Sequence, residues 1–157
     1  MLALFFQAGG QRYAFDAREL AEVAPDAQLR PLPGAPAPVA GLLHYRRTLV
    51  PVVDLSQLFA GRASRRLFST RILLVPFPGA GAGRLLGLRG EGVTEAARVE
   101  ARKPDPSGVA ESGDARLGAA GMDVKGPFRF VRVAALLPTA LCELLLAASA
   151  GEARSGS

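Results

Sequence analysis

The apolar runs of this chain are short, and turn-forming residues separate them. The first run, residues 2–6, ends before the turn signal Gly9-Gly10. In the next segment Tyr13 and Phe15 alternate with polar or small residues, which places successive side chains on opposite faces of an extended strand. These two segments predict a β-hairpin, and a chain that continues in this way is expected to be mainly β.

Five further segments continue the pattern. The expected strands are residues 39–45, 48–55, 71–76, 84–89 and 128–133. Pro51 has no N–H to donate to a sheet, so its strand is expected at an edge or at a bulge. The glycines of residues 79–83 resemble a phosphate-binding loop only superficially, because a strand rather than a helix follows them. We interpret them as a hairpin turn.

Other segments predict short helix or loop. Asp16 can cap a helical turn over residues 17–21, and Pro25 stops any longer helix. Four prolines within residues 31–38 predict an ordered, extended loop. Residues 101–121 are rich in Pro, Asp, Gly, Ser and Ala and predict a long mobile loop.

The last apolar segment has a helical period. Its apolar residues recur at i, i+3, i+4 and i+7, which is the spacing of one helix face: Leu141, Leu144, Leu145 and Ala148. We therefore expect an amphipathic helix over about residues 139–150 that caps an open end of the β structure. A membrane span is not expected, because Pro138 and Glu143 interrupt this segment and a span needs about 20 apolar residues. With no signal-peptide pattern at the N-terminus, we expect a cytoplasmic protein.

The chain is poor in residues that carry out catalysis or bind metal. A length of 157 residues predicts one domain with a sizeable core, and the single cysteine, Cys142, excludes an intramolecular disulfide. His44, the only histidine, lies in an apolar strand, and Cys142 has no Lys or Arg close in sequence to activate its thiol. No serine lies in a Gly-x-Ser-x-Gly motif. We predict no catalytic residue, no metal site, no cofactor and no enzymatic activity.

Positive charge is concentrated in the middle of the chain. Residues 46–89 hold eight arginines and one acid, whereas the formal charge of the whole chain is +5. Such a segment can meet nucleic acid, an anionic membrane or an acidic protein partner, although coding bias also explains an excess of arginine. The alternative function is a small β-barrel that binds nucleic acid, but Phe68 is the only aromatic residue near the four arginines that would contact phosphate: Arg62, Arg65, Arg66 and Arg71.

A weak internal repeat indicates a duplicated β unit. Arg12 and Glu22 in the first half correspond to Arg84 and Glu95 in the second, at offsets of 72 and 73 residues. In each half a run of apolar residues follows the arginine. The nearly constant offset predicts two copies of one small β unit.

Three motifs in the first half resemble a known family. They are Pro-Gly-Ala-Pro at residues 33–36, Val-Ala-Gly-Leu-Leu-His-Tyr-Arg at 39–46, and Val-Pro-Val-Val-Asp-Leu at 50–55. In this order and spacing they resemble the central signature of CheW-like domains, the adaptors of bacterial chemosensory arrays. Matches upstream, at Tyr13-Ala-Phe and Leu20-Ala-Glu22-Val, and downstream, at Gly87, Gly92-Val93 and Glu95, extend the resemblance over about residues 4–97.

The resemblance implies two small SH3-like, five-stranded barrels packed around a shared core, with a C-terminal helix. The chain, residues 1–157, is then expected to be a single domain, with the first barrel at about 1–60, the second at about 70–137 and the helix at about 139–150. The resemblance also implies two partners and no catalysis. The partners are the regulatory domain of a CheA-type histidine kinase and the cytoplasmic tip of a chemoreceptor, so the protein would meet a membrane only through receptors and would not bind nucleic acid.

The resemblance also implies roles for individual residues. The implied partner-binding residues are Leu20, Glu22, Arg46 and Val93. Leu20 is expected to face the receptor, and Arg46, the signature arginine, to clamp a carboxylate or backbone carbonyls with its planar guanidinium. The implied structural residues are Gly41, Pro51, Asp54 and Gly87. The two glycines would let backbones approach closely, and Asp54 would close a turn by accepting hydrogen bonds from backbone amides.

This chain departs from the family pattern at three places. Arg47 stands where the family usually has glycine, at a turn that often needs positive φ. Arg89 and Gly90 stand where the family usually has a Val-Asp pair, which removes an acid. The last strand lacks the expected Asp-Leu ending. The second half is therefore expected to be the more divergent one.

Overall fold

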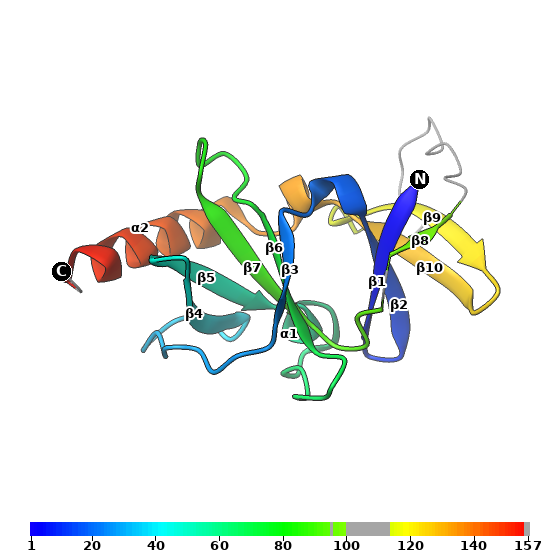
Figure 1. Cartoon of the computed structure of the whole chain (residues 1–157), viewed down its shortest axis with the longest axis horizontal. Helices are drawn as coiled ribbons and strands as arrows, with labels where there is room; N and C mark the ends of the chain where they lie inside the picture. The colour runs from blue at the N-terminus through cyan, green and yellow to red at the C-terminus, as the bar shows by residue number, and fades with distance from the viewer. Residues whose placement is uncertain (95, 100–113, 156–157) are drawn as a thin grey trace.

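The computed structural model describes residues 1–94, 96–99 and 114–155, which form two five-stranded sheets and a C-terminal helix (Figure 1). The first sheet has the order β8-β1-β2-β10-β9, with β8 Ala97–Arg98, β1 Leu2–Ala8, β2 Gln11–Asp16, β10 Gly126–Val131 and β9 Leu117–Asp123. The second has the order β3-β6-β7-β5-β4, with β3 Glu22–Pro25, β6 Arg71–Pro76, β7 Leu85–Gly90, β5 Thr48–Asp54 and β4 Val39–Tyr45. The helices are η1 Ala17–Glu19, α1 Leu55–Ala60, η2 Val133–Ala135 and α2 Thr139–Ser155. The predicted fold class, mainly β with two SH3-like barrels and a C-terminal helix, is confirmed.

The two sheets are built in the same way. β1 and β2 form an antiparallel hairpin with β10 parallel to β2, and β6 and β7 form a hairpin with β5 parallel to β7. The outer pairs, β9-β10 and β4-β5, are hairpins as well. The weak repeat in the sequence therefore corresponds to a duplicated β unit in the structure.

The division of the chain between the barrels differs from the sequence prediction. The hairpin β1-β2 shares a sheet with β8, β9 and β10, whereas β3 to β7, residues 22–90, form the other sheet. The strands of each sheet therefore do not follow the expected division into about 1–60 and about 70–137. The parallel contacts of β2 with β10 and of β5 with β7 join strands from opposite halves of the chain. Pairing of this kind needs long crossover connections and leaves no local signal in the sequence.

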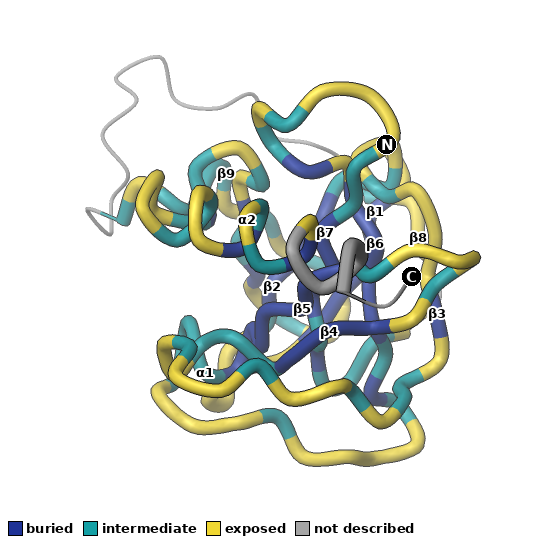
Figure 2. Tube along the Cα trace, turned by 90° about the vertical axis from the view of Figure 1, so that its left-hand side faces the viewer, coloured by how far each residue is buried: buried dark blue, intermediate teal, exposed yellow. Residues whose placement is uncertain are grey.

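A shared core joins the two sheets, and each sheet also has a core of its own. Phe6 of β1 lies in the shared core, whereas its neighbour Phe5 packs against Phe128 within the first sheet. In β6, Leu73 lies in the shared core and Ile72 in the core of the second sheet. Strands buried on both faces need apolar residues at every position, which explains the uninterrupted apolar run of β6. Figure 2 shows these central strands buried and the connecting loops exposed.

Strand β9 is not predicted by the sequence, because residues 117–121 fall in the segment expected to be a mobile loop. β9 carries few large apolar side chains and is held by antiparallel pairing with β10. In that pairing Gly121 lies opposite Phe128, and the absence of a Cβ leaves room for the ring. The loop prediction is wrong for residues 117–121, and residues 101–113 lie outside the described part of the chain.

Pro51 lies in a strand that is not at an edge, since β5 lies between β7 and β4. Its partner on β4, Leu42, exchanges hydrogen bonds with Arg30 instead of with β5, at N···O distances of 2.8 and 2.9 Å. The parallel pairing with β7 begins only at Val52. Pro51 therefore stands where neither neighbour needs an N–H, and the bulge of this hairpin lies on β4. The contact of Arg30 with Leu42 also joins the segment after β3 to β4. It closes the second sheet, β3 to β7, into a barrel, which is called the second barrel below.

Helix α2, Thr139–Ser155, extends past the predicted end at residue 150. Its buried face is rotated from the predicted stripe, because Leu145 is fully buried whereas Leu144 is 43% exposed. Ser149 is also buried, and its hydroxyl accepts a hydrogen bond from Arg84 Nη2 at 2.8 Å and donates to Leu145 O at 3.0 Å. Apolar periodicity cannot reveal a polar contact of this kind. None of the helices in the described residues is long and apolar enough to cross a membrane.

Candidate protein interface

Arg46 and Glu22 come together at the surface of the second sheet. Arg46 follows β4 and Glu22 begins β3, and Arg46 Nη2 lies 3.4 Å from Glu22 Oε2. The guanidinium also lies over the ring of Tyr45, 5.1 Å from its centroid. The Arg46 side chain is nevertheless 76% exposed. The exposed ion pair adds little to stability, but it orients a guanidinium whose other N–H groups remain open to a partner.

The turn that carries Arg46 has an unusual backbone. Arg46 has a φ of 46° and Arg47 a φ of 67°, and no other non-glycine residue in the described chain has a positive φ. Two-residue hairpin turns with positive φ at both positions prefer glycine, asparagine or aspartate. Two consecutive arginines therefore hold this turn against a steric cost of about 1 kcal/mol or more per residue.

Arg47→Gly is expected to raise the free energy of unfolding by about 1 kcal/mol, because glycine adopts positive φ without a Cβ clash. Denaturant unfolding of the two proteins measures this change. Arg47→Ala is the matched control, since it removes the same charge but keeps the Cβ, and it is expected not to stabilise. An equal gain from both variants would show that relief of charge repulsion, rather than of backbone strain, is responsible.

Leu20 lies just before β3 and is half-buried against the shared core. It follows the short helix η1, which Asp16 caps by accepting a hydrogen bond from the Arg18 amide at 3.0 Å. Hydrogen bonds from the Arg18 side chain lower the pKa of Asp16, whereas burial raises the pKa of Glu19. The capped turn thus fixes the position of Leu20, two residues before Glu22. The part of the Leu20 side chain that does not pack against the core faces solvent.

Val93 lies next to a different part of β6 from Glu22. It follows β7, packs against the shared core, and donates its N–H to Ser69 O at 3.0 Å, beside the start of β6. Glu22 pairs instead with Leu74, farther along β6. The structure therefore brings two of the four residues into contact, Glu22 and Arg46. Leu20 lies two residues before Glu22 in the chain, and Val93 packs beside Ser69.

Gly41 and Gly87 lie where the second sheet leaves no room for a side chain. Gly41 has a φ of 144°, and a Cβ there would lie 2.6 Å from the carbonyl oxygen of Arg30. A Cβ on Gly87 would lie 2.9 Å from Val52 and 3.1 Å from Ile72, on the two neighbouring strands. Both positions thus require a close approach between strands.

Asp54 is buried at the end of β5 and organises the segment that follows. Its carboxylate accepts from the Gln57 amide at 3.2 Å, which caps α1. It also accepts from the Ser64 amide at 2.9 Å and from the Ser64 hydroxyl at 2.8 Å. Three donors compensate for the burial of this carboxylate and hold the loop after α1 in place.

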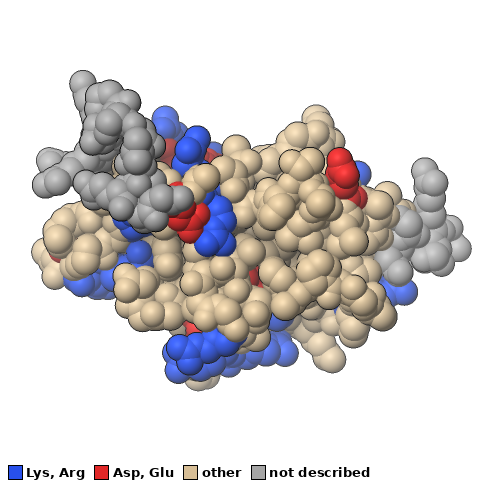
Figure 3. Space-filling view, turned by 180° about the vertical axis from the view of Figure 1, so that it is seen from behind, with Lys and Arg blue, Asp and Glu red and all other residues tan. Residues whose placement is uncertain are grey.

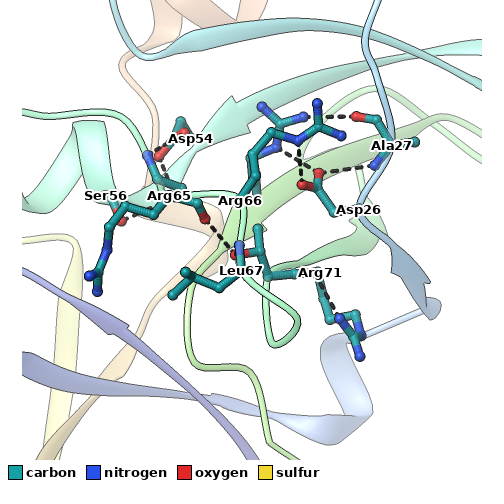
Figure 4. A network of polar contacts seen from close by, with 11 residues as sticks. Asp26, Ala27, Asp54, Ser56, Arg65, Arg66, Leu67 and Arg71 are labelled. Atoms are coloured by element: carbon teal, nitrogen blue, oxygen red, sulfur yellow. Dashed lines mark hydrogen bonds and ion pairs between the residues drawn. The ribbon is translucent and has the colours of Figure 1, made fainter.

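Basic side chains gather along one edge of the molecule in Figure 3, the edge where α1 and the following loop lie in Figure 1. Beneath this edge, Asp26 accepts from Arg66 Nε at 3.0 Å and from Arg89 Nε at 2.9 Å (Figure 4). Glu91 accepts from Arg65 Nε at 2.7 Å. Two of the four arginines considered for nucleic-acid binding, Arg65 and Arg66, thus each face a carboxylate of the chain itself.

These surfaces also expose apolar side chains that belong to none of the motifs described above. Val23 is 40% exposed beside Glu22, and Leu67 and Phe68 are 45% and 101% exposed in the loop between α1 and β6. The signal for the second pair is present in the sequence, because Leu67-Phe68 is an apolar pair inside a polar and basic interval.

The residues with the greatest chemical reactivity are not assembled into a site. Burial raises the pKa of the Cys142 thiol, which packs against the shared core, and His44 is exposed on β4. Within the described residues, no three His, Cys, Asp or Glu side chains lie close enough together to hold a metal ion.

Comparison with known proteins agrees with this architecture. A model of the CheW-like domain family matches residues 2–139, which include the strands of both sheets. No curated protein matches the sequence. Among solved structures, that of the scaffolding protein TtCheW from Thermoanaerobacter tengcongensis is similar, with a TM-score of 0.73 over 89% of each chain at 20% sequence identity.

Proposed function

The chain belongs to the CheW-like domain family, and from this premise we propose that it is a non-enzymatic adaptor in a bacterial chemosensory pathway. In this proposal it couples the cytoplasmic tip of a chemoreceptor to the regulatory domain of a CheA-type histidine kinase. It works in the cytoplasm and reaches the membrane only through receptors. Its action consists of binding, so it needs no cofactor.

The observation that carries the proposal is the oriented, exposed guanidinium of Arg46. The guanidinium pairs with the Glu22 carboxylate and lies over the Tyr45 ring, while 76% of the Arg46 side chain remains exposed. An arginine that is already oriented loses less side-chain freedom on binding, and its planar fork suits a carboxylate or a pair of carbonyl groups. Leu20, which follows the capped turn η1 and is half-buried against the shared core, would supply an apolar contact to the receptor in this proposal.

We expect the purified protein to bind the kinase regulatory domain and the receptor tip from its own source when each is tested separately. Arg46→Ala is expected to weaken at least one of these complexes tenfold or more, because truncating an interface arginine removes an anchor. Glu22→Gln keeps the guanidinium but removes its carboxylate support, so a smaller loss is expected. Isothermal titration calorimetry measures each affinity.

Arg132→Ala is the matched control, because Arg132 is an exposed arginine that follows β10 in the other sheet. It is expected to leave both affinities unchanged. If the folded wild-type protein bound neither partner, the adaptor function would be contradicted. Unchanged binding by Arg46→Ala would instead show that the interface lies elsewhere.

A further inference from the structure

The loop between α1 and β6 has a fixed conformation. Thr70 is fully buried, and its hydroxyl donates to Arg65 O at 2.6 Å and accepts from the Leu67 amide at 3.0 Å. The Arg71 guanidinium donates to the carbonyl oxygens of Phe68 and Thr70. Together with the hydrogen bonds that Ser64 donates to Asp54, these contacts occupy much of the polar backbone of the loop. The loop is therefore an ordered part of the protein surface.

This rigid loop holds its two apolar side chains in solvent. Phe68 is 101% exposed and Leu67 is 45% exposed, whereas the other phenylalanines of the chain pack in or against the cores. A single exposed apolar residue is ordinary. An aromatic side chain at the tip of an ordered loop differs, because a partner can bind it without the loss of conformational entropy that ordering a flexible loop would require. Aromatic residues and arginine are also the types enriched at protein interfaces.

The chain segment that contains this tip is basic. Residues 55–90 contain no acid, and four arginines lie in or next to the loop: Arg62, Arg65, Arg66 and Arg71. The Arg65 and Arg66 side chains are 77% and 56% exposed, although their acidic partners, Glu91 and Asp26, are only 14% and 11% exposed. The carboxylates thus lie on the inner side and steady the two guanidinium groups, which still present accessible surface.

We propose that the Leu67-Phe68 tip and its arginines form a docking site for an acidic segment of a partner protein that carries an apolar side chain between its carboxylates. Guanidinium groups pair with carboxylates through two parallel hydrogen bonds, and the exposed Phe68 ring of the same loop offers an apolar contact. A lipid surface would favour several inserted apolar residues, and nucleic acid would favour several stacking rings. The tip lies at the start of β6, away from Arg46, so this site is separate from the coupling surface proposed above.

The test is a selection of peptides on the full-length protein. A phage-displayed library of random dodecamers is selected on the wild type after depletion on Phe68→Ser, a substitution at a fully exposed position that leaves the packing intact. We expect the enriched peptides to carry net negative charge and at least one large apolar residue. A failure to enrich any sequence over the depleting variant, or enrichment of neutral or basic peptides, would overturn the proposal.

Synthetic copies of the enriched peptides then provide affinities by fluorescence polarisation. Phe68→Ser is expected to weaken binding at least tenfold and Arg62→Gln about threefold, and the affinity is expected to fall with added salt. Val124→Ser is the matched control, because Val124 is equally exposed on the distant turn between β9 and β10, and it is expected to bind like the wild type. Phe68-dependent binding of phosphatidylserine vesicles or of single-stranded DNA, with no peptide binding, would assign the tip to lipid or nucleic acid and overturn the proposal.

Discussion

Gly41→Ala is expected to lower the free energy of unfolding by about 3 kcal/mol. An added Cβ would lie 2.6 Å from the carbonyl oxygen of Arg30 and 3.0 Å from the Cβ of Leu29, and overpacking of this kind costs about 1–3 kcal/mol. The φ of 144° adds strain for any residue with a side chain. The obstructing oxygen belongs to the backbone and is itself hydrogen-bonded to the Leu42 amide at 2.9 Å. It cannot move aside without opening the contact that closes the second barrel.

Gly34→Ala separates the two costs. Gly34 also has a positive φ, 77°, but nothing lies within 4 Å of the position that a Cβ would take. Backbone strain alone, about 1 kcal/mol, is therefore expected. Urea unfolding of the three proteins gives both differences, provided that the slopes agree. If Gly41→Ala cost no more than Gly34→Ala, the close approach of Gly41 to Arg30 would not limit the packing of this barrel.

The sequence predicts those features of the fold that depend on neighbouring residues. The hairpins β1-β2, β4-β5 and β6-β7 follow from apolar runs on either side of a turn, and the Asp16 cap follows from one residue and the turn after it. The pairing of β2 with β10 joins strands separated by most of the chain. The exchange of strands between the barrels depends on such contacts, so local patterns could not predict it.

The candidate site shows the same division. The resemblance locates Glu22 and Arg46 in two separate motifs, but neither motif indicates that their side chains lie 3.4 Å apart. That contact follows from the closure of the second barrel, which brings the segment around β3 next to β4. Likewise, the basic interval is visible in the sequence, whereas the inward carboxylates of Asp26 and Glu91 come from other segments.

Strand β9 shows how a segment with little apolar surface is kept in a sheet. Arg12 of β2 makes a two-pronged contact with Asp123 at the end of β9, with N···O distances of 2.7 and 2.9 Å. Near the middle of the strand, Gly121 covers the ring of Phe128 on β10. The first contact is an ion pair. The second is the packing of the Phe128 ring against Gly121, which is possible because glycine has no side chain. Neither resembles the alternating apolar pattern by which strands are recognised.

Gly121→Ala is expected to lower the free energy of unfolding by about 2 kcal/mol, because the added Cβ would lie 2.3 Å from the nearest carbon of the Phe128 ring. The ring cannot turn away easily. It is 2% exposed and packs edge-on against Phe5 and Phe130, at centroid distances of 5.0 and 5.5 Å. Thermal unfolding is expected to show a midpoint several degrees lower than that of the wild type.

Gly118→Ala is the control on the same strand. Its Cβ would lie 3.4 Å from the flexible Arg132 side chain, which is an ordinary contact, so a change of less than about 0.5 kcal/mol is expected. A large loss at Gly121 together with a small one at Gly118 would show that the ring of Phe128 decides where β9 lies. Equal losses at the two positions would show that β9 needs glycine only for its backbone, and the contact with Phe128 would then contribute little to the position of the strand.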